Sequence, residues 1–366
     1  MCGIIGIISE EDVSSSIYES LTVIQHRGQD AAGMATLEDG KLHVRKQIGL
    51  VREVFRAQHI KNLKGKMGIG HVRYPTAGGV TREFSQPLYV NSPYGISICH
   101  NGNLVNSKEL TQELYENDLR HLNTDSDSEV ILNIFANEMQ KINSQSPSTE
   151  EIFSAVEKMH LRLKGAYSVV LMISGVGLLA IRDPNGIRPL MMGKKENDLL
   201  GKTDYMFASE SPALDALDFE ILGDLKPAEA VFVSLEGKMS RKICHNSPQH
   251  SPCIFEYVYL ARPDAVIEEI SVLKSRLRMG QKLGKKINSI YPNSKIDAVI
   301  PIPESSTSSA IEVAKYLGVN YREGFVKNRY IGRTFIMPKQ DMRRKSVRRK
   351  LNPIPFEFKD KNILLI

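Results

Sequence analysis

The sequence lacks the long apolar run that a membrane-spanning helix needs. No stretch of its 366 residues approaches the roughly 20 consecutive apolar residues of such a helix. The first twelve residues, from Met1 to Asp12, also lack the basic flank of a secretion signal. We therefore expect a cytoplasmic protein that does not associate with membranes.

Cysteine is also scarce, with only four in the chain. Four are too few for a disulfide framework in a chain of this length, so we interpret all of them as thiols until one shows a role. They are Cys2, Cys99, Cys244 and Cys253.

The formal net charge of +6 is small, but basic residues gather near the end of the chain. Six lysines and arginines lie between Arg343 and Lys350. Taken alone, this run fits a solvated face or a nucleic-acid patch equally well. Because no aromatic residues are interleaved, we expect no nucleic-acid partner and favour an anionic ligand.

The composition, 42% apolar and 25% charged, is that of a globular protein, and the length suggests two domains. Short apolar runs broken by Gly, Pro and Asn predict strands at Gly3–Ile8, Gly68–Val72 and Ile96–Cys99. Apolar residues one turn apart predict helices at Ser107–Tyr115 and Ser126–Lys141. The first half is therefore rich in strands.

The second of these helices has a distinctive start. Ser126 and Glu129 have the spacing of a capping box. Asp127 then falls in the first turn, where the helix dipole favours an ionised carboxylate. Residues 124–129 also resemble a calcium loop but lack its sixth-position glycine and distal glutamate, so we prefer the helix start.

A polar, turn-rich stretch from about Pro227 to Cys253 separates two patterns. We place the boundary there, giving domains at residues 2–235 and 236–366. The second domain alternates helix and strand, which predicts an open parallel sheet. Its expected elements are a helix at Ser271–Ile287, a strand at Ile296–Ile302, a loop at Glu304–Ser309, a helix at Ala310–Leu317 and a strand at Lys361–Ile366.

Cys2 is a candidate nucleophile. A small second residue leaves Met1 removable, and the freed α-amine, with a pKa near 8, can serve as the general base for its own thiol. The alternative is a small buried hydrophobe at the start of a strand.

Three further segments carry candidate site residues. Arg27 and Arg73 lie among glycines and offer guanidinium groups suited to a carboxylate, or to structural ion pairs. Asn101 and Gly102 can form an oxyanion hole, or simply a tight Asn-Gly turn. Asp127 is available to meet an ammonium group.

Four segments together resemble the glutaminase domain of N-terminal-nucleophile amidotransferases. They are Cys2–Ile7, His26–Gly33, His100–Asn103 and Asp125–Glu129. The second half narrows the resemblance to the glutamine phosphoribosylpyrophosphate amidotransferase family, through Phe255–Asp264, Val299–Glu304, Gly324–Pro338 and Ser346–Asn352. That family makes 5-phosphoribosylamine in the first step of purine synthesis.

The resemblance implies an α/β chain with a four-layer αββα sandwich followed by a type I phosphoribosyltransferase-like parallel sheet. It also implies roles for matching residues. Cys2 would be the nucleophile, Asn101 and Gly102 the oxyanion hole, and Arg27, Gly28, Arg73 and Asp127 the glutamine pocket. Phosphoribosylpyrophosphate would meet Ser305, Ser306, Thr307, Ser308, Lys327 and Lys350, and Lys327–Lys350 would form a loop closing over its phosphates.

The same resemblance implies cofactors and partners. One Mg²⁺ per subunit would lie near Ser305, and we expect no iron–sulfur cluster, because only Cys253 matches a cluster ligand. The family further suggests a homotetramer inhibited by AMP and GMP.

Family members continue into an aspartate pair just after the residues that match Asn362–Ile366, and the present sequence ends before it. We therefore expect a fragment of a longer protein. The alternatives are a chain that retains only glutaminase activity, a non-catalytic subunit, and a glutaminase that feeds a different acceptor.

Overall fold

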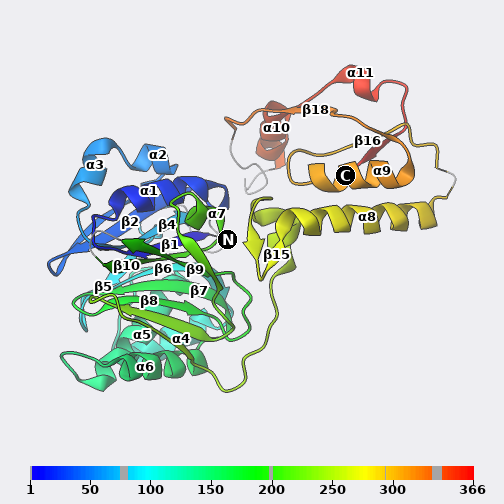
Figure 1. Cartoon of the computed structure of the whole chain (residues 1–366). Helices are drawn as coiled ribbons and strands as arrows, with labels where there is room; N and C mark the ends of the chain where they lie inside the picture. The colour runs from blue at the N-terminus through cyan, green and yellow to red at the C-terminus, as the bar shows by residue number, and fades with distance from the viewer. Residues whose placement is uncertain (1, 75–80, 198–200, 293, 332–339) are drawn as a thin grey trace. The chain divides into compact units, whose positions relative to one another are not determined.

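The computed structural model describes residues 2–74, 81–197, 201–292, 294–331 and 340–366 (Figure 1). It divides into two compact units, Met1–Cys253 and Ile254–Ile366. The sequence-based boundary at 235/236 falls between strands β12 (Glu229–Ser234) and β13 (Met239–Ile243), which pair antiparallel. Because of this pairing, the first unit extends beyond Leu235.

The first unit contains two stacked sheets. The seven-stranded sheet has the order β11 (Glu220–Asp224), β9 (Met191–Asn197), β10 (Lys202–Ala208), β1 (Gly3–Ile8), β4 (Met67–Arg73), β2 (Ala31–Glu38), β3 (Lys41–Ile48). The six-stranded sheet has the order β13, β12, β8 (Gly177–Arg182), β7 (Gly165–Ile173), β6 (Ile96–Leu104), β5 (Leu88–Val90).

Strand β1 shows why these residues build layers. Its side chains alternate between faces, as in any strand. Ile4 and Ile8 join the apolar cluster that includes Val170 of the other sheet, whereas Ile5 and Ile7 join the cluster under the helices. Both faces are buried, which explains why β1 reads as an almost continuous apolar run.

Helices cover the outer faces of both sheets (Figure 1). Helices α1 (Ser14–Val23), α2 (Val51–Val54), α3 (Ala57–Asn62) and α7 (Pro212–Asp215), with the short 3₁₀ helix η1 (Gln25–Arg27), lie on the seven-stranded side. Helices α4 (Ser107–Glu116), α5 (Asp127–Ile142) and α6 (Thr149–Arg162) lie on the six-stranded side. The predicted αββα four-layer sandwich is thereby confirmed.

Helix α5 begins at Asp127, with Ser126 as its N-cap. The Ser126 hydroxyl accepts a hydrogen bond from the Ser128 amide at 3.3 Å. The predicted capping box is wrong in both halves, because this bond joins the N-cap to the second helical residue and not to Glu129, the third. The Glu129 carboxylate instead accepts hydrogen bonds from the amides of Asn123 and Thr124, both at 2.8 Å, because the preceding loop turns its amides toward it.

The second unit contains the expected parallel sheet, with β16 (Ala298–Ile300) between β17 (Asn320–Tyr321) and β20 (Ile363–Leu365). Helix α9 (Thr307–Leu317) packs on it and ends at Leu317, as predicted, with Gly318 as its C-cap, but it begins earlier than the expected Ala310. It also packs against helix α8 (Val272–Ile290). A Cβ at Gly280 of α8 would lie 2.5 Å from the Ser309 carbonyl oxygen, so this close approach requires glycine.

The remaining elements of this unit are short. They are η2 (Glu256–Leu260), β14 (Val266–Ile267), β15 (Ile270–Ser271), β18 (Phe325–Lys327), α10 (Gln340–Lys350), β19 (Leu351–Pro353) and α11 (Pro355–Phe358). Residues 332–339 of the implied closing loop lie outside the described residues, and Gln340–Lys350, implied as loop, forms a helix. In the described ranges, no helix is both long and apolar enough to cross a bilayer.

We predict that Glu129→Gln lowers the free energy of unfolding by about 2–3 kcal/mol, because a buried charged acceptor is lost from several hydrogen bonds. The matched control is Glu109→Gln on the exposed face of α4, which should cost only a few tenths of a kcal/mol. Urea unfolding followed by circular dichroism measures both. Equal losses in the two variants would contradict the prediction.

Candidate active site

Cys2 lies at the start of β1, and three of its atoms have partners from other elements. Its amide donates to Asn101 Oδ1 at 3.0 Å, and its carbonyl accepts from Arg27 Nε at 2.9 Å. Its Sγ lies 3.5 Å from the Tyr74 amide nitrogen. The order of the sheet explains this meeting, because β4, which ends next to Tyr74, pairs with β1.

The contact with Cys2 fixes the orientation of the Asn101 side chain. Because the Cys2 amide is a donor, the atom facing it must be the amide oxygen of Asn101. The Nδ2 of Asn101 is buried and has no hydrogen-bond partner among the described residues. An unused buried donor therefore lies beside the thiol-bearing residue.

Gly102 follows Asn101 in β6, and its lack of a side chain matters. A Cβ at this position would lie 2.0 Å from the Ala166 carbonyl oxygen and 2.6 Å from His100 Nε2. No other residue fits without displacing the neighbouring strand β7.

Arg27 and Gly28 occupy the end of η1. Arg27 is fully buried, and its Nη1 lies 2.5 Å from Glu210 Oε1. A Cβ on Gly28 would lie 2.4 Å from the Val72 carbonyl carbon, so glycine lets η1 approach the end of β4. Arg27 is thus held between Glu210 and the Cys2 carbonyl.

Arg73 and Asp127 complete the predicted glutamine pocket. Burial lowers the pKa of Arg73, while the Cys2 thiol, Asp30 and Asp127 pull it upward. Its Cζ lies 5.4 Å from the centre of the Phe84 ring. The Asp127 Oδ2 accepts from the Leu104 amide at 3.0 Å, which holds the start of α5 against the end of β6. The structure therefore brings all seven predicted residues of this site together.

Two buried histidines lie close to Asn101: His100 precedes it in β6, and His71 lies on β4. His71 Nε2 lies 3.2 Å from the His100 carbonyl oxygen, and His100 Nδ1 lies 2.9 Å from Ser128 Oγ. Burial lowers the pKa of His71 to about 3 and also lowers that of His100. Both rings are therefore neutral near pH 7, so they add no charge near Asn101 and Gly102.

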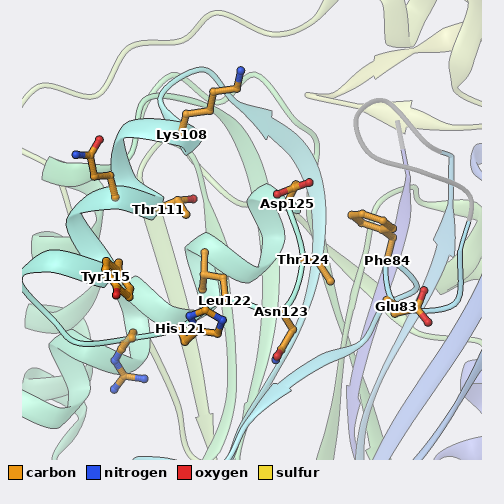
Figure 2. A pocket seen from close by; sticks show the side chains of 12 residues that line it. Glu83, Phe84, Lys108, Thr111, Tyr115, His121, Leu122, Asn123, Thr124 and Asp125 are labelled. Carbon is orange, nitrogen blue, oxygen red and sulfur yellow. The ribbon is translucent and has the colours of Figure 1, made fainter.

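A pocket of about 570 Å³ adjoins these residues (Figure 2). Phe84, which contacts Arg73, lies on one side of it, and Lys108 and Tyr115 of α4 lie on the other. Thr124 and Asp125, just before Asp127, lie between them. None of the seven candidate residues lines this pocket, and its links to the candidate site are the contact of Phe84 with Arg73 and the position of Asp125 two residues before Asp127.

The predicted phosphate-binding residues of the second unit lie at one end of its sheet. Ser305 to Ser308 span the end of the loop after β16 and the first turn of α9. Lys327 Nζ lies 3.0 Å from Glu304 Oε2, which places this lysine beside the loop. The Lys350 carbonyl accepts from the Asn328 amide at 2.8 Å, so the end of α10 lies next to the residue after Lys327.

Among the residues that the structure describes, no three His, Cys, Asp or Glu side chains form a group able to hold a metal ion. Mg²⁺ commonly uses one or two protein oxygens together with substrate phosphates. The Ser305 hydroxyl and the neighbouring Glu304 carboxylate fit that limited contribution, but not a dedicated protein cage. All four cysteines are free thiols.

Sequence reasoning assigned no role to two residues that contact the site. Tyr74 directs its amide at the Cys2 sulfur, and Glu210 bonds to Arg27. Glu210 carried one available signal, since a carboxylate directly after the apolar end of β10 is unusual. Tyr74 carried none, because its contact is made by the main chain.

Comparisons with known proteins agree with this geometry. Residues 79–216 match the model of the glutamine amidotransferase domain family. The whole chain is 55% identical to an amidophosphoribosyltransferase from Pseudomonas aeruginosa and 53% identical to one from Escherichia coli, covering 73% and 72% of them. It also matches a solved structure, the glutamine phosphoribosylpyrophosphate amidotransferase from B. subtilis complexed with ADP and GMP. That match has a TM-score of 0.82 and 34% identity over the whole chain and 74% of the solved one.

We predict that the protein loses stability as the pH falls below about 6.5. The folded-state pKa of His71, about 3, lies below the ordinary value near 6.5, so the unfolded state binds the proton more readily. Between these values the free energy of unfolding should fall by up to about 1.4 kcal/mol per pH unit for this residue, and above about pH 7 the contribution is constant.

Urea unfolding between pH 7 and pH 5 tests this expectation. His71→Gln should show a shallower dependence on pH than the unsubstituted protein. The control is His43→Gln, in which the replaced ring is partly exposed on β3, at the position that pairs with Thr36 of β2. An unchanged slope in His71→Gln would refute the assignment.

Proposed function

Because the chain belongs to the amidophosphoribosyltransferase family, we propose that the groups meeting at Cys2 carry out the glutamine-hydrolysing half of its reaction. The enzyme transfers ammonia from glutamine to phosphoribosylpyrophosphate, giving 5-phosphoribosylamine, glutamate and pyrophosphate. This reaction is the first step of purine biosynthesis. A non-catalytic role is not favoured, because identities of 47–55% extend over the whole chain.

The observation that carries this proposal is the unused Nδ2 of Asn101. In the proposed mechanism, removal of Met1 frees the Cys2 amine, which stays on Asn101 Oδ1 and takes the thiol proton. The thiolate attacks the carboxamide carbon of glutamine. Asn101 Nδ2 and the Gly102 amide donate to the developing oxyanion. The Cys2 amine returns its proton to the substrate nitrogen as the C–N bond breaks, so that ammonia leaves, and water then hydrolyses the thioester to glutamate and the free thiol.

The charged end of the substrate would meet two residues of opposite charge that lie within electrostatic reach of each other. Arg73 is placed to bind the α-carboxylate of glutamine, and Asp127 its α-ammonium group. Arg27 and Gly28 would form the wall next to Cys2. Two opposite charges on a rigid frame select a free amino acid, since a peptide-bound glutamine lacks both groups.

The second unit would bind phosphoribosylpyrophosphate. The amides at the start of α9 and the hydroxyls of Ser305 to Ser308 would bind its pyrophosphate, because the start of a helix that follows a strand favours an anion. Lys327 and Lys350 would add positive charge. Ser305 would contact a magnesium ion carried by the phosphates, one per subunit. When bound, that ion offsets negative charge on the departing pyrophosphate.

We also propose a cytoplasmic location, a homotetrameric assembly and inhibition by AMP and GMP. The B. subtilis relative, a complex with ADP and GMP, supports nucleotide binding by this chain. A reducing compartment also suits a mechanism that depends on a free thiol.

Substitution of Cys2 and Asn101 tests the glutaminase half. Cys2→Ala should abolish glutamate release from glutamine, and Asn101→Ala should lower kcat by about 10²–10³-fold with a smaller change in KM, because the lost donor acts mainly in the transition state. Coupled glutamate dehydrogenase measures both. Cys253→Ala and the exposed Asn91→Ala are controls and should keep full activity. Persistent hydrolysis in Cys2→Ala would disprove the nucleophile.

Substitution of Lys327 tests the transferase half. Lys327→Gln should raise KM for phosphoribosylpyrophosphate by about 10–100-fold, the value of one charge-assisted hydrogen bond, and leave glutamine hydrolysis without that substrate unchanged. Lys315→Gln, on the exposed last turn of α9, is the control. Phosphoribosylamine formation with magnesium is the readout. Turnover of a different acceptor in its place would identify a different amidotransferase.

A further inference from the structure

Glu210 is a fully buried carboxylate that lies just after β10. Its Oε1 accepts from Arg27 Nη1 at 2.5 Å and lies 2.8 Å from His26 Nε2. The turn that carries it is itself fixed, because the Ser209 hydroxyl accepts from the Ile4 amide at 3.0 Å. Glu210 is therefore anchored to the strand that begins at Cys2.

Arg27 connects this carboxylate to Cys2. The guanidinium group donates through Nη1 to Glu210 and through Nε to the Cys2 carbonyl oxygen. Its donors have a fixed planar geometry, so the direction of one bond determines that of the other. The position of the Glu210 carboxylate thus sets where Arg27 meets the main chain of Cys2.

Burial makes this arrangement dependent on charge. Arg27 and Glu210 have fully buried side chains. A buried guanidinium that loses an adjacent carboxylate must move or recruit water. Either response would break the hydrogen bond from Arg27 Nε to the Cys2 carbonyl oxygen. The Cys2 main chain would then be less fixed, and the position of its thiol would change.

We propose that Glu210 is a positioning residue for glutamine hydrolysis, which acts through Arg27 to hold the Cys2 thiol in its reactive position. This inference rests on the proposed nucleophilic role of Cys2. Glu210 touches neither the thiol nor the predicted oxyanion donors in any contact described above. A purely structural ion pair would stabilise the fold without affecting the reactivity of Cys2.

The experiment compares Glu210→Gln with Glu229→Gln in the full chain. Glu229 is the matched control, since it is also buried and pairs with an arginine, Arg241, at 2.8 Å, but on β12. Thermal unfolding, kcat and KM for glutamine are measured. Alkylation of Cys2 by iodoacetamide is followed by peptide mass spectrometry, with the partly exposed Cys253 as internal reference.

Glu210→Gln should lower both kcat and the rate of Cys2 alkylation by about 10–100-fold, the usual effect of displacing a reacting group by about 1 Å. KM for glutamine should change by less than about threefold, because Arg73 and Asp127, which would bind the charged end of glutamine, do not depend on Arg27 in any contact described above. Glu229→Gln should leave all three values unchanged. Normal kcat and Cys2 alkylation in a folded Glu210→Gln protein would overturn the inference.

A double-mutant cycle tests the route through Arg27. Glu210→Gln combined with Arg27→Met should be no slower than Arg27→Met alone. Additive losses would show that Glu210 does not act through Arg27. If Glu210→Gln does not fold, Glu210→Asp keeps the charge but shortens the side chain. Slower Cys2 alkylation in that variant supports the inference, and an unchanged rate overturns it.

These outcomes are separate from failure of the proposed function. Persistent glutamine hydrolysis in Cys2→Ala would disprove the nucleophile whatever Glu210 does. Loss of hydrolysis in Cys2→Ala, with full activity in Glu210→Gln, would disprove only the positioning role.

Discussion

The hydrogen bond from the Cys2 nitrogen to Asn101 Oδ1 organises the candidate active site of the first unit. It joins the start of β1, the middle strand of the seven-stranded sheet, to β6, which lies next to the edge of the six-stranded sheet, and it leaves the Asn101 Nδ2 as an unused donor. Its geometry depends on the apolar layer between the sheets, where Ile4 packs in one cluster with Val170 and Phe207. The packing of the apolar core between the sheets therefore fixes the positions of the polar groups in the candidate site.

Side chains near this hydrogen bond are charged where an acidic group lies close enough to offset the cost of burying the charge, and neutral where none does. Arg27 keeps its charge in the interior because a carboxylate lies at hydrogen-bond distance. Arg73 is buried beside acidic groups, with Asp30 and Asp127 raising its pKa against the effect of burial. His71, which lies near Arg73, is instead held neutral. The buried histidine near Asn101 is thus uncharged. The charged side chains of Arg73 and Asp127 lie where a zwitterionic ligand could contact both of them.

The sequence was informative where a feature depends on neighbouring residues. Local patterns of apolar residues and caps predict the strand at Gly3–Ile8 and the start of α5 at Asp127. They also predict the end of α9, which Gly318 caps. The prediction of a capping box was wrong because the Glu129 carboxylate accepts hydrogen bonds from the amides of Asn123 and Thr124 in the preceding loop. Glu210 was missed because its partner Arg27 is 183 positions away, and no local pattern encodes such a pair.

The two predicted binding regions differ in how much of their geometry exists before substrate arrives. The groups around Cys2 are held by hydrogen bonds that are at least partly buried, so binding there would cost little further ordering. Near the phosphate loop, Lys327 pairs with the exposed Glu304 carboxylate. An exposed pair of this kind contributes at most about 1 kcal/mol, so a phosphate can replace the carboxylate at small cost. Because a phosphate carries more charge than a carboxylate, the exchange would favour a phosphate-bearing ligand.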